Sequence, residues 1–216
     1  MNSRFPCPLC DDQESTFYFT DSKNYQHTYH RCRHCDLVFV IPACRLDREA
    51  EKARYEMHHN DNSDDYVRFL SRLAKPTLQY LPPHSHGLDF GSGKSQAMAD
   101  LFRRAGHQCD CYDLFYYADT TLLQRQYDFI LASEVIEHLY QPKMVFEQWL
   151  SLLKTNGILA IMTGFRPADK DFPNWWYKND PTHVSLFSSK TFAYLQTTYQ
   201  LQRLCTEKNI VLFKQS

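Results

Sequence analysis

Four cysteines near the start of the chain have the spacing of ligands to a structural metal ion. Cys7 and Cys10 form one Cys-x-x-Cys pair, Cys32 and Cys35 form a second, and residues 11–31 lie between them. Two such pairs let two tight turns offer four thiolates to one Zn²⁺, in a closed tetrahedral shell with no open position for chemistry. The pattern therefore predicts a structural zinc site.

A second segment has the pattern of a nucleotide-binding turn. A short strand over 87–90 leads into Gly91-Ser92-Gly93, a helix follows over 97–105, and a strand over 108–112 ends at Asp113. Glycines let the backbone approach a ligand closely, and the amino terminus of a helix offers N–H donors. An acid about twenty residues later can accept the hydroxyls of a ribose. The sequence thus predicts a β-α-β unit that binds a nucleotide cofactor.

Three other interpretations of this turn have weaker support. A phosphate-binding loop ending in Gly93-Lys94-Ser95 needs a glycine at position 88, which is leucine. The tripeptide at 89–91 matches a kinase motif, but no other kinase motif accompanies it. A dinucleotide fingerprint needs a third glycine where Gln96 stands, which weakens NAD as the cofactor without excluding it.

The rest of the chain continues an α/β pattern. An apolar strand over 127–132 leads into the segment 133–138, Ser-Glu-Val-Ile-Glu-His, and a helix begins at Pro142. A strand over 158–163, an aromatic block over 172–177 and a helix over 188–199 follow. Two closing strands, over 201–207 and 210–214, complete the pattern.

In this order the motifs resemble class I S-adenosylmethionine-dependent methyltransferases, over roughly residues 85–216. The segment 133–138 is similar to the subgroup of ubiquinone-type and sugar C-methyltransferases. The sugar enzymes also carry an amino-terminal Cys-x-x-Cys zinc module, but they have a further carboxyl-terminal domain that these residues do not contain. The resemblance implies an α/β fold with a Rossmann-like, mostly parallel seven-stranded sheet, or an abbreviated form of it, beside a small zinc ribbon.

The resemblance also implies residues that bind S-adenosylmethionine. By position, the methionine part of the cofactor would be lined by Asp89, Gly91, Ser92 and Gly93. Asp113 would bind the ribose, and Ser133 and Glu134 would face the cofactor at the end of their strand. The chain departs from the family at Ser95, which replaces a third glycine. Residues 114–126 are also too few for the usual helix, strand and helix, so we expect an abbreviated crossover, with Asp119 as the candidate for adenine recognition.

Residues for the acceptor side come from two regions. His183 is a candidate to accept a proton, because the ordinary pKa of a histidine side chain lies near neutral pH. The alternative is that His183 fixes its loop by a hydrogen bond to the backbone. Tyr55 and His58, from a charged helical linker, are candidates to close over the opening of the acceptor site. The aromatic residues at 175–177 either pack in a core or lid, or form a platform for the substrate.

Composition narrows the partners. The net charge is -1, and residues 1–58 carry eight Lys/Arg against nine Asp/Glu, so neither the chain nor its first part has the basic field typical of nucleic-acid binding. The start of the sequence lacks the apolar region of a signal peptide, and no run reaches the roughly 18 apolar residues of a membrane span. We therefore expect a cytoplasmic protein with reduced thiols and no membrane partner.

The sequence predicts three regions: a zinc ribbon over 1–44, a helical linker or lid over 45–83 and a cofactor-binding domain over 84–216. The predicted function is S-adenosylmethionine-dependent methylation of a small-molecule acceptor. Three alternatives are an RNA methyltransferase that docks its substrate through the zinc ribbon, a non-catalytic zinc-containing adapter and an NAD-dependent oxidoreductase. The sequence predicts neither the acceptor nor the oligomeric state.

Overall fold

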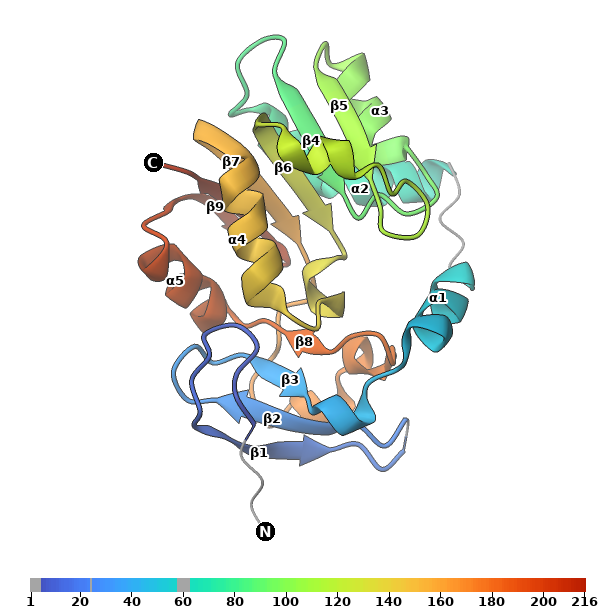
Figure 1. Cartoon of the computed structure of the whole chain (residues 1–216), viewed down its shortest axis with the longest axis vertical. Coiled ribbons are helices and arrows are strands. Elements are labelled where there is room, and N and C mark those ends of the chain that lie inside the picture. The colour runs from blue at the N-terminus through green and yellow to red at the C-terminus, as the bar shows by residue number, and fades with distance from the viewer. Residues whose placement is uncertain (1–4, 24, 58–62) are drawn as a thin grey trace. The chain divides into compact units, whose positions relative to one another are not determined.

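A computed structural model describes residues 5–23, 25–57 and 63–216 (Figure 1). Its contacts divide the chain into two compact units. Unit 1 comprises residues 1–57, 136–146 and 164–198, and unit 2 comprises residues 58–135, 147–163 and 199–216. Each unit therefore collects segments that are far apart in sequence. Among the described residues, no helix is long and apolar enough to cross a membrane.

Unit 2 is built on a six-stranded sheet with the order β5-β4-β6-β7-β10-β9. In chain order the strands are β4 (His86–Phe90), β5 (Gln108–Tyr112), β6 (Tyr127–Ser133), β7 (Leu153–Met162), β9 (Gln202–Glu207) and β10 (Ile210–Lys214). The first four are parallel, and β9 and β10 form an antiparallel hairpin that pairs with β7. This mostly parallel α/β sheet with a closing hairpin confirms the predicted fold class.

The sheet is the abbreviated form and not the full seven-stranded one. Between β5 and β6 the chain makes only an isolated bridge, from Asp113 to Tyr117, and a short 3-10 helix, η2 (Thr120–Gln124). The physical reason is length, because residues 114–126 cannot supply a helix, a strand and a second helix. The full seven-strand expectation is therefore wrong within the described residues, and the abbreviated crossover is confirmed.

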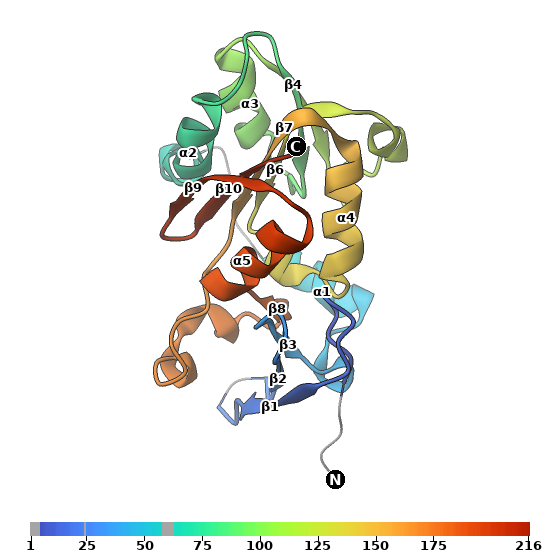
Figure 2. The same ribbon diagram turned by 90° about the vertical axis from the view of Figure 1, so that its left-hand side faces the viewer.

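Helices cover both faces of this sheet. The helices α2 (Asp64–Leu78) and α3 (Ala97–Arg104) pack on one face (Figure 2), where alternate strand residues such as Phe129, Leu131 and Leu212 form the core with them. On the other face, Trp149 of α4 (Pro142–Leu152) packs edge-on against Phe90, with ring centroids 5.5 Å apart. The side chains alternate between faces because a strand has a period of two residues.

The helix α2 begins directly after a capping serine. The Ser63 hydroxyl accepts a hydrogen bond from the backbone N–H of Tyr66 at 3.3 Å, and two acids follow in the first turn. This is a favourable amino-terminal cap, with negative charge at the positive end of the helix dipole. Pro76 lies within the last turn without ending the helix.

Unit 1 contains a four-stranded antiparallel sheet with the order β1-β2-β3-β8. Its strands are β1 (Ser15–Thr20), β2 (Thr28–Cys32), β3 (Val38–Val40) and β8 (Ser185–Leu186), and β1 and β2 form an antiparallel hairpin between the two cysteine pairs. The sheet carries an apolar cluster that includes Tyr29, Phe172 and Tyr177. Its other helical segments are η1 (Pro42–Cys44), α1 (Arg48–Glu56), η3 (Ile136–His138), η4 (Phe172–Asn174), η5 (Trp176–Asn179) and α5 (Ser189–Thr198).

A buried ion pair ties the segment before β3 to a distant part of unit 1. The Asp36 carboxylate accepts hydrogen bonds from Arg166 at 2.7 Å and from the Ser188 hydroxyl. Burial disfavours ionisation of Asp36, but the Ser188 hydrogen bond and the two nearby arginines outweigh burial and hold its pKa below the usual range. The Arg166 guanidinium also contacts the Asp169 carboxylate at 2.9 Å. The Asp169 side chain is 61% exposed, whereas that of Asp36 is 11% exposed.

We expect Asp36→Asn to lower the free energy of unfolding by about 3–5 kcal/mol, because it removes the buried partner charge of Arg166 and leaves that guanidinium paired with the exposed carboxylate of Asp169. Asp169→Asn is the matched control, since it removes an exposed partner of the same arginine and should cost less than about 1 kcal/mol. Urea unfolding of both variants measures the difference. Equal losses in the two variants would contradict the importance of the buried pair.

Candidate functional sites

The four cysteines meet in unit 1 on two equivalent turns. In each turn the residue after the second cysteine, Asp11 or Asp36, has a positive φ, 58° or 66°. The N–H of that residue donates to the carbonyl of the first cysteine, Cys7 or Cys32, at 3.0 and 3.2 Å. Two turns of the same geometry therefore present two thiols each.

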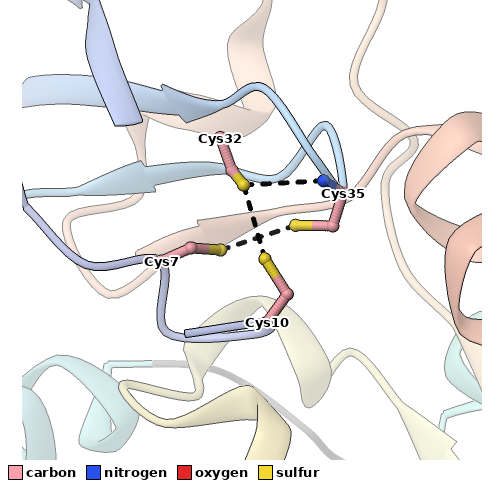
Figure 3. A group of neighbouring side chains, drawn as sticks. All are labelled: Cys7, Cys10, Cys32 and Cys35. Carbon is pink, nitrogen blue, oxygen red and sulfur yellow. Dashed lines mark hydrogen bonds between the residues drawn. The ribbon is translucent and has the colours of Figure 1, made fainter. Parts of the chain in front are cut away.

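Figure 3 shows the four sulfur atoms pointing toward one another. The Sγ atoms of Cys7 and Cys35 lie 3.4 Å apart, as do those of Cys10 and Cys32, and all four lie within 4.8 Å of one another. A Zn–S bond of about 2.3 Å places tetrahedral sulfurs about 3.8 Å apart. The donor set therefore fits a zinc ion, and its all-sulfur chemistry favours a soft metal.

The glycine turn lies in unit 2, at the carboxyl end of β4. Gly91 and Gly93 have positive φ values of 75° and 65°, and a Cβ on Gly91 would lie 2.5 Å from a methyl group of Val135. The Asp113 carboxylate accepts the N–H of Gly93 at 3.0 Å and that of Phe115 at 2.8 Å. Asp113 thus fixes both the turn and the start of the short crossover. The N–H of Tyr116 donates to the same carboxylate at 3.1 Å. A carboxylate has about four acceptor positions, so about one remains for a further donor.

Buried polar atoms gather beside this turn. Within the described residues, Asp89 Oδ2 and the Ser133 hydroxyl are buried without a hydrogen-bond partner. Burial, and then the nearby charge of Asp113, raises the pKa of Asp89 to about 7. Buried polar groups in proteins nearly always have partners, so these two atoms mark a place where a ligand with polar groups fits.

The end of β6 is strained at the adjoining position. Glu134 has a φ of 54°, and its N–H donates to the Met162 carbonyl at 2.8 Å. A residue other than glycine in this conformation costs roughly 1–2 kcal/mol, and such residues concentrate at functional sites. Burial, followed by the charges of Asp89 and Glu134, raises the pKa of Tyr66 to about 12. Tyr66, at the start of α2, therefore lies close enough to Asp89 and Glu134 to feel their charges, although no sequence motif indicated it.

Ser92 is buried in the turn, and its N–H donates to the Tyr112 carbonyl at 3.2 Å. The structure thus brings all the predicted cofactor residues to the carboxyl ends of neighbouring parallel strands. Asp119, the adenine candidate, caps η2 by accepting the N–H and the hydroxyl of Thr121 at 3.0 and 2.7 Å.

His183 belongs to unit 1 and is buried among ionisable and aromatic groups. Its Nδ1 lies 2.6 Å from the Tyr177 carbonyl, so the hydrogen bond to the backbone that the alternative interpretation of His183 requires is present. The Tyr177 hydroxyl donates to the carboxylate of Glu137, which is fully buried. Glu137 and its neighbour His138 lie in the predicted motif at 133–138, yet the sequence argument gave neither a role.

Tyr55 lies near the same group. Its ring centroid is 5.3 Å from that of His138, and its hydroxyl donates to Glu51 at 2.9 Å. Burial, together with the Glu51 charge, raises the pKa of Tyr55 well above the usual range, so Tyr55 is a donor and not a base at neutral pH. His58 lies outside the described residues. Of the aromatic block, Tyr177 is buried while Trp176 is 72% exposed.

A profile of the methyltransferase-domain family matches residues 45–205. The solved 1,6-didemethyltoxoflavin-N1-methyltransferase of Burkholderia thailandensis, bound to 1,6-didemethyltoxoflavin and S-adenosylhomocysteine, has a TM-score of 0.52 and 13% sequence identity, over 93% of this chain and 99% of that one. The plantazolicin methyltransferase BpumL in complex with S-adenosylhomocysteine has a TM-score of 0.51 and 14% identity, over 78% of this chain and 92% of that one. No curated protein matches the sequence.

The sheet order and the glycine turn at its carboxyl edge define a Rossmann-like methyltransferase fold, and both solved structures share that fold. The family match covers most of the chain, and the chain therefore belongs to the methyltransferase-domain family. The prediction that it is a methyltransferase enzyme is confirmed.

The raised pKa of Asp89 predicts a pH-dependent stability. The folded protein keeps this proton up to about pH 7, whereas an unfolded aspartate loses it near pH 4, so stability should fall as the pH rises between these values. Relative to the wild type, Asp89→Asn should therefore gain up to about 4 kcal/mol between pH 4 and pH 7 and no more above. Denaturant unfolding at several pH values measures this gain. A stability difference that does not change with pH would show that Asp89 titrates normally.

Proposed function

We propose that this enzyme transfers a methyl group from S-adenosylmethionine to a small-molecule acceptor. The observation that carries the proposal is that two buried side-chain oxygens, Asp89 Oδ2 and the Ser133 hydroxyl, have no hydrogen-bond partner among the described residues. They lie beside the turn in which Gly91 and Gly93 have positive φ values. Both solved structures named above contain S-adenosylhomocysteine, the product that this cofactor leaves after methyl transfer.

Each predicted cofactor residue has a distinct task in this proposal. Asp89 would accept donors of the methionine part of the cofactor, which balances the acid's burial. Gly91, Ser92 and Gly93 would let the backbone approach that part closely, because a Cβ on Gly91 already collides with Val135. The remaining acceptor capacity of Asp113 would take a ribose hydroxyl.

The end of β6 completes the proposed cofactor site. The Ser133 hydroxyl and the strained backbone at Glu134 would face the cofactor. S-adenosylmethionine supplies an electrophilic methyl group on a positively charged sulfonium. A site containing acids and the aromatic face of Tyr66 favours such a charge, while the surrounding apolar core excludes water.

A small-molecule acceptor is favoured over RNA because the chain has no basic surface excess, with 24 Lys/Arg against 25 Asp/Glu. We assign His183 and Tyr55 to the acceptor side. Since the Tyr177 carbonyl can only accept, His183 carries its proton on Nδ1, and Nε2 carries the lone pair. His58 stays a prediction from sequence.

We further propose that Cys7, Cys10, Cys32 and Cys35 bind a structural Zn²⁺ in an amino-terminal module. Support comes from the repeated turn geometry and the converging sulfurs. The family match begins at residue 45, which leaves the cysteines outside it. Thiolates that hold zinc need a reducing compartment, which favours the cytoplasm.

For the cofactor, we expect calorimetric titration to show micromolar binding of S-adenosylmethionine, and no comparable binding of NAD or ATP. Asp113→Ala should weaken binding at least about tenfold, a loss of about 1.4 kcal/mol, because it removes the acceptor for the ribose and releases the Gly93 turn. The matched control is Asp110→Ala. Asp110 precedes it on β5 and pairs instead with His86 and Arg125.

The control should bind within about twofold of the wild type. If the wild-type protein bound NAD and not S-adenosylmethionine, the proposed cofactor would be wrong. If it bound neither, the non-catalytic adapter would become the better explanation of the zinc module.

For the zinc module, we expect metal analysis of purified protein to find Zn²⁺ retained through dialysis. Cys10→Ser should reduce zinc retention and lower the unfolding temperature, because one of four thiolates is replaced by a weak ligand and metal binding contributes to folding. Cys205→Ser, on β9 in unit 2, is the matched control and should leave the zinc content unchanged. Equal zinc content in all three proteins would argue against the four-cysteine site.

A further inference from the structure

Three side chains able to bind a metal ion meet in unit 1, apart from the four cysteines. They are Glu137 and His138 of η3 and His183, which precedes β8. One ligand atom of each lies within 4.8 Å of the others, and the two imidazole rings are 4.7 Å apart between centroids.

Both histidines are held in the same tautomer. His183 Nδ1 lies 2.6 Å from the Tyr177 carbonyl, and His138 Nδ1 lies 3.2 Å from the Thr182 carbonyl. A carbonyl oxygen can only accept, so each Nδ1 carries the proton and each Nε2 carries a lone pair. Metal-binding histidines are usually oriented in this way, by donating their other ring N–H to a backbone carbonyl or a carboxylate.

The third side chain has the corresponding support. The Glu137 carboxylate accepts the Tyr177 hydroxyl, and the Glu137 carbonyl accepts the N–H of Val184 at 2.8 Å. Tyr177 therefore orients two of the three groups, Glu137 through its hydroxyl and His183 through its carbonyl. Glu137 is fully buried, and a cation beside a buried carboxylate balances its charge. A divalent cation would supply that charge.

We propose that Glu137, His138 and His183 bind a divalent transition-metal ion. Two imidazole nitrogens and one carboxylate oxygen leave at least one coordination position open, unlike the closed shell of four cysteines. The open position suits water or an oxygen of a substrate, whose pKa the ion lowers. The metal site stands without the proposed methyl transfer, and only its use for an acceptor oxygen rests on that function.

The test uses the full-length protein with its cysteine site already loaded with Zn²⁺. Mn²⁺ is added and followed by calorimetry and electron paramagnetic resonance, and Zn²⁺ is tested in a separate titration. Mn²⁺ prefers nitrogen and oxygen ligands and does not compete well for thiolates, so it reports on the second site. We expect one further ion to bind per chain.

The variants separate binding from folding. His138→Asn and His183→Asn each keep a donor near the position of Nδ1 but lack Nε2, and each should weaken Mn²⁺ binding at least about tenfold. Tyr177→Phe, which removes only the hydroxyl that orients Glu137, should weaken it by about 10–100-fold. His27→Asn, a buried histidine elsewhere in unit 1, is the control and should bind as the wild type does. Circular dichroism confirms that each variant is folded.

The wild-type titration decides the proposal even if every variant unfolds. If neither Mn²⁺ nor Zn²⁺ binds beyond the one zinc of the cysteine site, the proposal is wrong. It is also wrong if folded His138→Asn and His183→Asn bind Mn²⁺ like the wild type. S-adenosylmethionine binding is measured in the same samples with and without Mn²⁺. Loss of cofactor binding with retained Mn²⁺ binding would overturn the proposed function alone.

Discussion

The interior of unit 1 depends on one buried carboxylate, Glu137. Its side chain accepts the hydroxyl of Tyr177 from η5, and its backbone carbonyl accepts the N–H of Val184, next to β8. Because β8 pairs with β3, this residue links the segment after β6 to the sheet that also bears the cysteine turns. The short 3-10 helix, the aromatic block and the small sheet thus share one polar centre, with two histidines directed to it.

Unit 2 holds its own buried acid by a different arrangement. Asp89 has one oxygen without a partner among the described residues, and its raised pKa keeps it protonated in weak acid. An unsatisfied buried group costs about 1–3 kcal/mol, which the packed core on both faces of the sheet must offset. The neighbouring Asp113 satisfies backbone amides of the turn and the crossover, so of these two acids Asp89 is the one with a buried oxygen that has no partner among the described residues.

Local patterns in the sequence were sufficient for much of this architecture. The Cys-x-x-Cys spacing, the β-α-β unit and the cap at Ser63 depend on residues close in sequence, whose geometry physical rules fix. The pairing of β3 with β8 could not be predicted in this way, because the two strands lie about 145 residues apart and β8 has only two residues. For the same reason the sequence indicated His183 alone, without the contacts to Tyr177 and Glu137 that define its tautomer.

Asp89 and Glu137 also show why local sequence patterns locate the proposed cofactor residues more readily than the proposed acceptor residues. Asp89, Gly91 and Asp113 lie on one β-α-β unit, so their spacing in sequence determines their meeting in space. Glu137 and His183 meet only because the segment 164–187 folds back onto η3. No periodicity in the sequence predicts this contact. A cofactor site can thus use a fixed local frame, while the acceptor side changes with the inserted segments. Under the proposed function, contacts such as that of Tyr177 with Glu137 would select the substrate, whereas the glycine turn identifies only the class.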